Sequence, residues 1–204
     1  MSSVRKAHIE RKTSETDIVM DLVLDGSGKC DVDTGIGFFD HMLASFARHG
    51  LFDLTCHVKG GLHVDCHHTI EDTGIVLGQA IREAAGDKKG IRRFGSFLLP
   101  MDECLVLSAV DLSGRPYLVC DLLFSVERVG DFDTEMVREF FYAVSYSGAM
   151  NLHLKLIHGG NAHHVMEAAF KAFAKALDEA TQKDPRIMDV LSTKIGRASC
   201  RERV

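Results

Sequence analysis

The sequence has no run of apolar residues close to the roughly 20 that a membrane-spanning helix requires. Its first residues, MSSVRKAHIERKTSETD, lack the apolar core of a signal peptide. The six cysteines include no C-x-x-C pair, and the formal net charge of −5 argues against a broad basic surface. We therefore expect a cytoplasmic protein with reduced thiols and with neither membrane nor nucleic-acid partners.

The length of 204 residues suits one compact domain or two small similar halves. The last ten residues, IGRASCRERV, differ from the rest because they are rich in arginine and lack apolar periodicity. We interpret residues 195–204 as a non-native tail, and a genuine disordered basic tail is the alternative.

Histidine is concentrated in two short windows. Eight of the 11 histidines lie in residues 57–68 and 153–164, which contain the similar motifs HHTIED and HHVME. When the chain is shifted by 96 positions, residues 54–84 align without a gap on residues 150–180. Histidines, glutamates and apolar positions coincide in this alignment, and such self-similarity indicates duplicated structural units.

The duplication predicts a first half, residues 1–90, and a second half, residues 91–194. In each half we expect strands, then a helix, a short strand and a helix opened by the histidine pair. The expected elements are the strands 17–28, 54–60, 103–124 (two strands) and 151–156, and the helices 37–50 and 134–148 and those starting at 67 and 163. This pattern predicts an α+β fold of two similar halves, each a small antiparallel or mixed sheet covered by helices.

The repeated motifs suit metal binding. On a helix, a histidine and a glutamate four positions later share one face, whereas adjacent histidines point about 100° apart. Each pair is therefore expected to divide between two ions. The candidate ligands are His41, His67, His68, Glu71, Glu139, His163, His164 and Glu167. Imidazole with carboxylate favours manganese, iron, cobalt or zinc, and the lack of cysteine ligands argues against a structural zinc.

The eighth ligand is the least determined of the set. With a two-residue gap, the repeat extends upstream and aligns Glu139 with His41. His153 and its repeat partner His57 are symmetric alternatives, although both lie in predicted strands where burial is the simpler interpretation.

Longer stretches of the chain resemble the imidazoleglycerol-phosphate dehydratase family. The similarity is found in DTGIGFFDHML, HHTIEDTGIVLGQA, GIRRFGSFLLPMDE, DLSGRPYL, GGNAHHVMEAAFKAFAKAL and STK. The resemblance implies a lyase of histidine biosynthesis that converts D-erythro-imidazole glycerol phosphate to imidazole acetol phosphate and water. It further implies a ribosomal protein S5 domain 2-like fold, two Mn²⁺ ions per active site, and trimers that form 24 subunits with active sites between subunits.

The resemblance also assigns residues. It maps seven of the candidate metal ligands onto this chain, whereas many members have histidine where Glu139 stands. It implies substrate contacts at Glu15, His49, Arg93, Arg115, Lys171, Ser192 and Lys194, and the C-terminal segment that holds the last two would close the pocket. Arg92 competes with Arg93, and only the family pattern selects Arg93.

The implied reaction needs a proton removed from a carbon that no carbonyl acidifies. The substrate's own imidazole, held as imidazolate between two ions, would activate the neighbouring hydroxyl as a leaving group. Glu15 is the first candidate for general acid and base work, and His49 and Asp102 are second candidates. An exposed carboxylate in a polar turn is the alternative interpretation of Glu15.

Two rival functions remain at this point. The first is a catalytically degenerate metal-binding shell protein of the same fold, which would need no phosphate pocket. The second is a dinuclear metallohydrolase acting on phosphate esters, which would be expected to use an aspartate-rich ligand set rather than a histidine-rich one.

Overall fold

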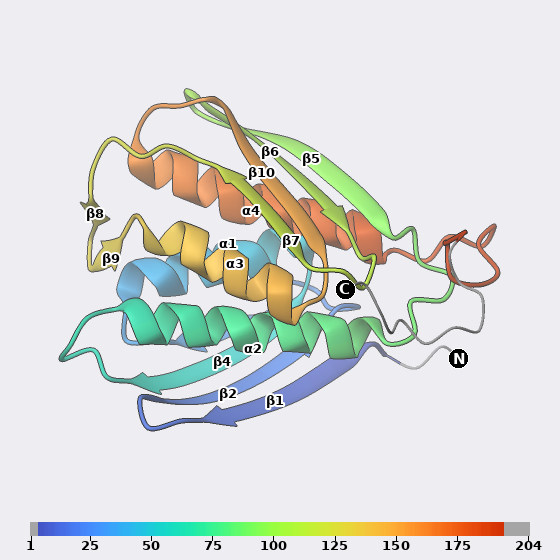
Figure 1. Cartoon of the computed structure of the whole chain (residues 1–204), viewed down its shortest axis with the longest axis horizontal. Helices are drawn as coiled ribbons and strands as arrows, with labels where there is room; N and C mark the ends of the chain where they lie inside the picture. The colour runs from blue at the N-terminus through green and yellow to red at the C-terminus, as the bar shows by residue number, and fades with distance from the viewer. Residues whose placement is uncertain (1–3, 194–204) are drawn as a thin grey trace, which may run out of the picture.

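The computed structural model describes residues 4–193, and it contains two four-stranded sheets with four helices between them (Figure 1). The first half comprises β1 (Lys6–Lys12), β2 (Thr16–Val23), β3 (Cys30–Asp33), α1 (Gly37–Gly50), β4 (Asp53–Gly60) and α2 (His67–Ala85). The second comprises β5 (Phe94–Met101), β6 (Cys104–Asp111), β7 (Tyr117–Asp121), β8 (Arg128–Val129), β9 (Phe132–Asp133), α3 (Met136–Ser147), β10 (Asn151–His158) and α4 (Ala162–Thr181).

The two sheets have matching topology. Their strand orders are β1-β2-β4-β3 and β5-β6-β10-β7, so each strand of the first has a counterpart in the second. In each sheet the last pair, β3 with β4 and β7 with β10, is parallel, and the other pairs are antiparallel. The predicted α+β fold of two similar halves with mixed sheets is therefore confirmed.

Some strands are absent from the prediction. β1 and β5 are edge strands, and the sequence of β1, KAHIERK, places charged or polar residues at most positions. β5 contains Pro100, which an edge strand tolerates because its missing N–H does not interrupt a central ladder. β3 has only four residues, too few for an alternation to stand out.

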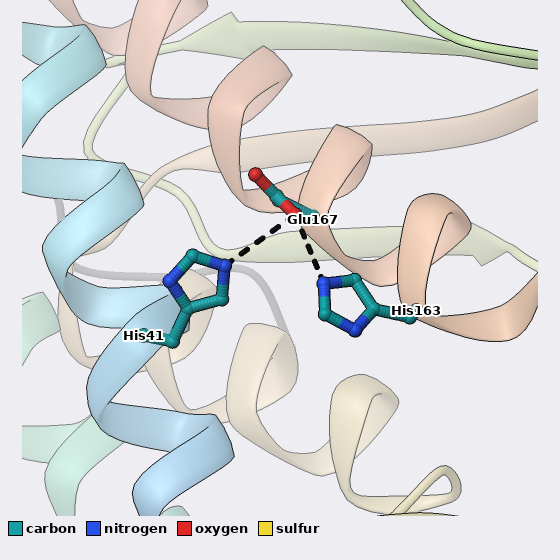
Figure 2. A group of neighbouring side chains, drawn as sticks. All are labelled: His41, His163 and Glu167. Atoms are coloured by element: carbon teal, nitrogen blue, oxygen red, sulfur yellow. Dashed lines mark hydrogen bonds and ion pairs between the residues drawn. The ribbon is translucent and has the colours of Figure 1, made fainter.

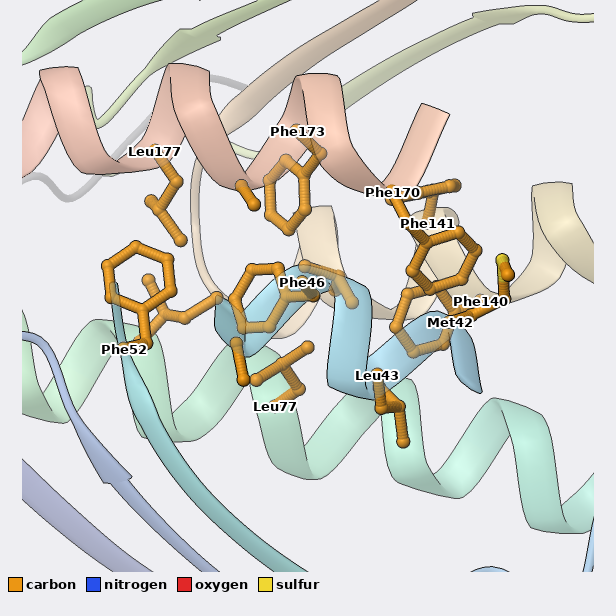
Figure 3. Close-up of a cluster of buried hydrophobic side chains, with 14 of the residues drawn as sticks. Met42, Leu43, Phe46, Phe52, Leu77, Phe140, Phe141, Phe170, Phe173 and Leu177 are labelled. Atoms are coloured by element: carbon orange, nitrogen blue, oxygen red, sulfur yellow. The ribbon is translucent and has the colours of Figure 1, made fainter. Parts of the chain in front are cut away.

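The helices share one hydrophobic core (Figure 3). Phe46 of α1 stacks on Phe173 of α4 with ring centroids 5.6 Å apart, and Phe140 of α3 stacks on Phe170 of α4 at 5.0 Å. Because α1 packs on α4 and α2 packs on α3, each half covers the helices of the other. The two halves thus have the same topology, and their helices are buried against one another in the shared core.

Candidate active site

Three side chains from the two halves meet where α1 and α4 begin (Figure 2). The Glu167 Oε2 atom lies 3.1 Å from His163 Nε2 and 3.5 Å from His41 Nε2. Glu167 is buried, whereas both imidazoles are about half exposed, so the cluster opens to solvent on the histidine side. Two imidazoles and a carboxylate within 4.8 Å of one another fit a divalent transition metal that accepts further ligands.

Local structure fixes both ends of this cluster. The side chain of Asn161 caps α4 by accepting a hydrogen bond of 2.9 Å from the backbone N–H of His163. One helical turn later, Glu167 lies on the same face as His163. The Phe38 ring contacts the His163 ring edge-on at 5.0 Å and restricts its orientation. The packing of α1 against α4 then brings His41 to the same point.

The first half supplies a smaller counterpart. His67 Nε2 lies 3.5 Å from Glu71 Oε2, and Asp65 accepts a 2.8 Å hydrogen bond from the backbone N–H of His67 where α2 begins. Glu139 is half-buried on α3, which packs on α2. Among residues 4–193, however, Glu139 belongs neither to the His41–His163–Glu167 cluster nor to the other close group, which consists of Asp102, Glu103 and His164. One chain therefore assembles three candidate ligands in one place and two in the other.

The alternative ligands His57 and His153 lie elsewhere. Each is exposed in its strand, on the face opposite the buried neighbours that contact the helices. The interpretation that these histidines are buried is wrong, because strand alternation turns them to the outer face of each sheet. His153 therefore lies on the outside of the second sheet, away from the helix-covered face.

The second histidine of each pair contacts a hairpin tip. His68 Nε2 lies 3.7 Å from Glu15 Oε1 at the turn between β1 and β2. His164 of α4 contacts the turn between β5 and β6: its Nε2 atom is 3.7 Å from Asp102, and its Nδ1 atom is 3.0 Å from Glu103. Within each pair the ring centroids are 6.0 Å apart, so adjacent histidines face different partners.

Glu103 is the residue that sequence reasoning missed. Its carboxylate accepts a 2.7 Å hydrogen bond from the backbone N–H of Asn161. This bond, together with the contact to His164, lowers the pKa of Glu103 to about 2. Its signal in the sequence was positional, because Glu103 occupies the hairpin tip of the second half as Glu15 does in the first.

Lys171 and His49 lie along the same pair of helices. Lys171 Nζ is 2.6 Å from Glu167 Oε1. Burial alone would raise the pKa of Glu167, but the Lys171 hydrogen bond and the charges of Lys171 and His41 outweigh it and lower that pKa. Burial and the charge of Lys171 lower the pKa of His49 below its ordinary value, which favours the neutral imidazole.

Arg93 and Ser192 lie at the opposite end of α4. The backbone N–H of Arg93 donates to Ala180, and its guanidinium donates to Asp111 (2.7 and 3.1 Å) and to the carbonyl of Leu191. Arg93 and Ser192 both line a cavity of about 520 Å³. From His163 to Ala180 is seventeen residues of helix, or roughly 25 Å. Within one chain, Arg93 is therefore remote from the His41–His163–Glu167 cluster.

The remaining predicted contacts are distributed as follows. Arg115 lies in the connection between β6 and β7, where its carbonyl accepts a 2.6 Å hydrogen bond from Asn151. Arg92 faces Glu179 at 3.7 Å. Lys194 and the tail 195–204 lie outside the described residues.

Fold and site together define an α+β protein with a histidine–carboxylate cluster between duplicated halves. A model of the family "Imidazoleglycerol-phosphate dehydratase" matches residues 34–177. Proteins of that name from Lachnoclostridium phytofermentans and Acetivibrio thermocellus are 65% and 58% identical over 190 residues, covering 93% of this chain and 97% of each relative. The chain belongs to the imidazoleglycerol-phosphate dehydratase family.

Solved structures agree with this assignment. The imidazoleglycerol-phosphate dehydratase from Staphylococcus aureus is 40% identical, with a TM-score of 0.78 over 88% of this chain and 99% of that chain. The enzyme from Pyrococcus furiosus is 35% identical, with a TM-score of 0.78 over 91% and 98%. The protein is thus a hydro-lyase of histidine biosynthesis, which converts imidazole glycerol phosphate to imidazole acetol phosphate and water. Among residues 4–193, no helix has both the length and the apolarity to cross a bilayer.

Proposed function

We propose that this dehydratase depends on two Mn²⁺ ions, and that each half of the duplication supplies one set of ligands. The close approach of His41, His163 and Glu167 is the observation that supports the proposal. His67 and Glu71, with Glu139 on the neighbouring helix, would form the second set. When bound, such ions act as Lewis acids that orient the substrate's imidazole and stabilise its deprotonated form.

His68 and His164 complete the proposed ligand set. Both point away from the cluster of their own helix, toward the hairpin tips. Each is therefore available to an ion whose other ligands come from a second copy of the chain. The proposal keeps Glu139 as the eighth ligand, because His153 lies on the outer face of its sheet.

Glu15 is proposed as the general acid and base. Its side chain is half-exposed at a hairpin tip and lies 3.7 Å from His68, so it faces the proposed metal ligands without being buried by them. In this role its carboxylate takes the proton from the substrate carbon next to the carbinol. Asp102 and His49 are the second candidates, the former because it lies at the matching hairpin tip.

The phosphate is proposed to bind Lys171, Arg93, Arg115, Ser192 and Lys194. Lys171 is one helical turn from Glu167, but Arg93 lies at the far end of α4. One small substrate cannot span the length of that helix. The proposal therefore places the active site between subunits of a homo-oligomer, with trimers assembled into 24 subunits.

The cytoplasm is the proposed location. The five described cysteines, Cys30, Cys56, Cys66, Cys104 and Cys120, are all free thiols. Free thiols and a role in amino-acid biosynthesis both favour a reducing compartment.

The test is metal removal and replacement. The full chain and a version ending at Lys194 are treated with a chelator and refilled with Mn²⁺, and formation of imidazole acetol phosphate is followed together with bound metal. We expect turnover to disappear on stripping and to return as two ions bind per active site. Full turnover of metal-free protein would contradict the metal dependence, and release of inorganic phosphate would instead indicate a phosphate-ester hydrolase.

A further inference from the structure

The turn that contains Glu15 is held by hydrogen bonds to the Thr13 hydroxyl and from Gly61. The Thr13 hydroxyl oxygen accepts from the backbone N–H groups of Glu15 at 3.1 Å and of Thr16 at 3.0 Å. The carbonyl of Glu15 accepts from the N–H of Gly61 at 3.2 Å. These bonds fix the shape of the turn, but they do not fix the turn relative to α2, where His68 lies.

Asp72 makes that second connection. It lies on α2 directly after Glu71 and is only 8% exposed. One carboxylate oxygen accepts from the Thr16 hydroxyl, and the other accepts from Arg11 Nε at 3.1 Å and Nη2 at 2.9 Å. Arg11 is on β1 and Thr16 is on β2, so one buried carboxylate joins both strands of the hairpin to the helix.

The second half has a different arrangement. Ala168 follows Glu167 in the repeat of the motif, so the counterpart of Asp72 has no carboxylate. There the hairpin between β5 and β6 is attached by Glu103 itself, through the N–H of Asn161 and the ring of His164. The Glu103 carboxylate is therefore engaged in the hydrogen bonds that attach its hairpin to α4. In the first half Asp72 provides the polar attachment, in addition to the packing of β1 and β2 on α2, and the carboxylate of Glu15 is left half-exposed.

We propose that Asp72 is a positioning residue for the dehydratase reaction: it holds the β1–β2 hairpin so that Glu15 stays beside His68. The inference rests on the proposed acid–base role of Glu15. Its physical basis is that a displacement of about 1 Å at a reacting group can cost about a hundredfold in rate. The same geometry assigns the acid–base work to the first hairpin rather than the second.

The test uses the full chain loaded with Mn²⁺ and the variant Asp72→Asn, which keeps the shape and removes the charge that Arg11 pairs with. We expect kcat to fall about tenfold to a hundredfold, with KM and bound metal within about twofold of the parent. Thr16→Val, which removes only the hydroxyl donor, is a second variant if Asp72→Asn folds poorly.

The matched control is Asp17→Asn, the same change on the same hairpin, where Asp17 pairs outward with Lys12. Its kcat should stay within about twofold of the parent.

A double variant separates positioning from general structure. If Asp72 acts through Glu15, adding Asp72→Asn to the Glu15→Gln variant should not lower its kcat further, because both changes remove the same function. Multiplied losses would overturn the inference, as would parent-like kcat in Asp72→Asn.

A readout independent of turnover separates this inference from the proposed function. Amide hydrogen exchange across residues 13–17 should accelerate in Asp72→Asn, while exchange across residues 101–104, in the other hairpin, stays unchanged. Unchanged protection of residues 13–17 would overturn the inference even if the parent enzyme is fully active. An inactive parent with accelerated exchange in the variant would instead contradict the proposed metal and acid–base roles.

Discussion

Two glutamates that occupy the same place in the repeated motif have different surroundings. The Glu167 side chain is 9% exposed and contacts His41 and Lys171 as well as His163, whereas the Glu71 side chain is 42% exposed and lies near His67. The surroundings differ because His41 of α1 and Lys171 of α4 both approach the Glu167 carboxylate. Of the two proposed metal sites, the one with Glu167 is therefore the better preorganised within a single chain.

Glu167→Gln should remove one of the two ions. The amide keeps the size of the side chain but weakens the ligand and leaves Lys171 without its carboxylate. We expect bound Mn²⁺ to fall from two ions to one, and the loss of kcat to exceed the roughly 10–100-fold typical of outer-shell changes. Elemental analysis with steady-state kinetics checks this, with Glu83→Gln on the exposed face of α2 as the matched control. Retention of both ions at normal affinity would contradict the ligand role.

Glu15→Gln should affect chemistry and spare metal binding. The amide can still accept a hydrogen bond but cannot move a proton, so we expect kcat to fall by about 10²–10⁴-fold, the usual contribution of general acid–base catalysis. Substrate affinity and bound Mn²⁺ should remain close to those of the parent. If turnover stays near normal, Asp102 and His49 become the residues to test.

At the scale of elements, the contact between α2 and α3 depends on glycine. A Cβ atom on Gly78 would lie 2.6 Å from the carbonyl oxygen of Val144 and 2.8 Å from the nitrogen of Gly148. Gly74, one turn earlier, meets the carbonyl of Phe140 in the same way. The two helices therefore approach backbone to backbone, which fixes the position of α3 and its Glu139 relative to His67.

Gly78→Ala should destabilise the protein, although alanine is the better helix former by about 1 kcal/mol. Overpacking at a backbone contact typically costs about 1–3 kcal/mol, so we expect a lower Tm and a weaker second metal site. Gly37→Ala is the control, because a Cβ atom on Gly37, in the first turn of α1, meets nothing within 4 Å. Equal Tm values for the two variants would show that α3 can shift without cost.

At the scale of the whole molecule, one chain holds the proposed metal ligands and the proposed phosphate-binding arginine far apart. The His41–His163–Glu167 cluster lies where α4 begins, and Arg93 is attached near its C-terminal end. Both positions are set by one shared core, so neither can move toward the other without unpacking the helices. This separation is the reason for the proposal that the active site combines surfaces from more than one copy of the chain.

Mixed oligomers test this directly. Co-expressed His163→Ala and Arg93→Ala chains, each inactive alone, should give active assemblies, because some sites then combine the intact cluster of one chain with the intact arginine of another. Co-expressed His163→Ala and His41→Ala chains should remain inactive, since both changes damage the same cluster within one chain. The enzyme assay on purified co-assemblies decides the matter, and failure of the first pair to complement would place the whole site in a single subunit.

Local sequence patterns determined much of this protein. The apolar spacing and the closing glycine gave α1 its observed bounds, 37–50, and the histidine pairs stand where α2 and α4 begin. The four-residue spacing from His163 to Glu167 determined that both share one helix face. These features follow from backbone geometry over a few residues, so the sequence alone is enough to predict them.

Only the tertiary structure decided which distant residues meet. Three contacts join segments that are far apart in the chain: His41 with Glu167, Glu103 with Asn161, and Asp72 with Arg11. The distance of Arg93 from the cluster is likewise set by tertiary packing. Such contacts depend on how whole helices and hairpins pack around the shared core. The repeat predicted two equivalent halves, and packing made their sites unequal, because His41 of α1 reaches Glu167, whereas its counterpart Glu139 on α3 joins no close group of ligands among residues 4–193.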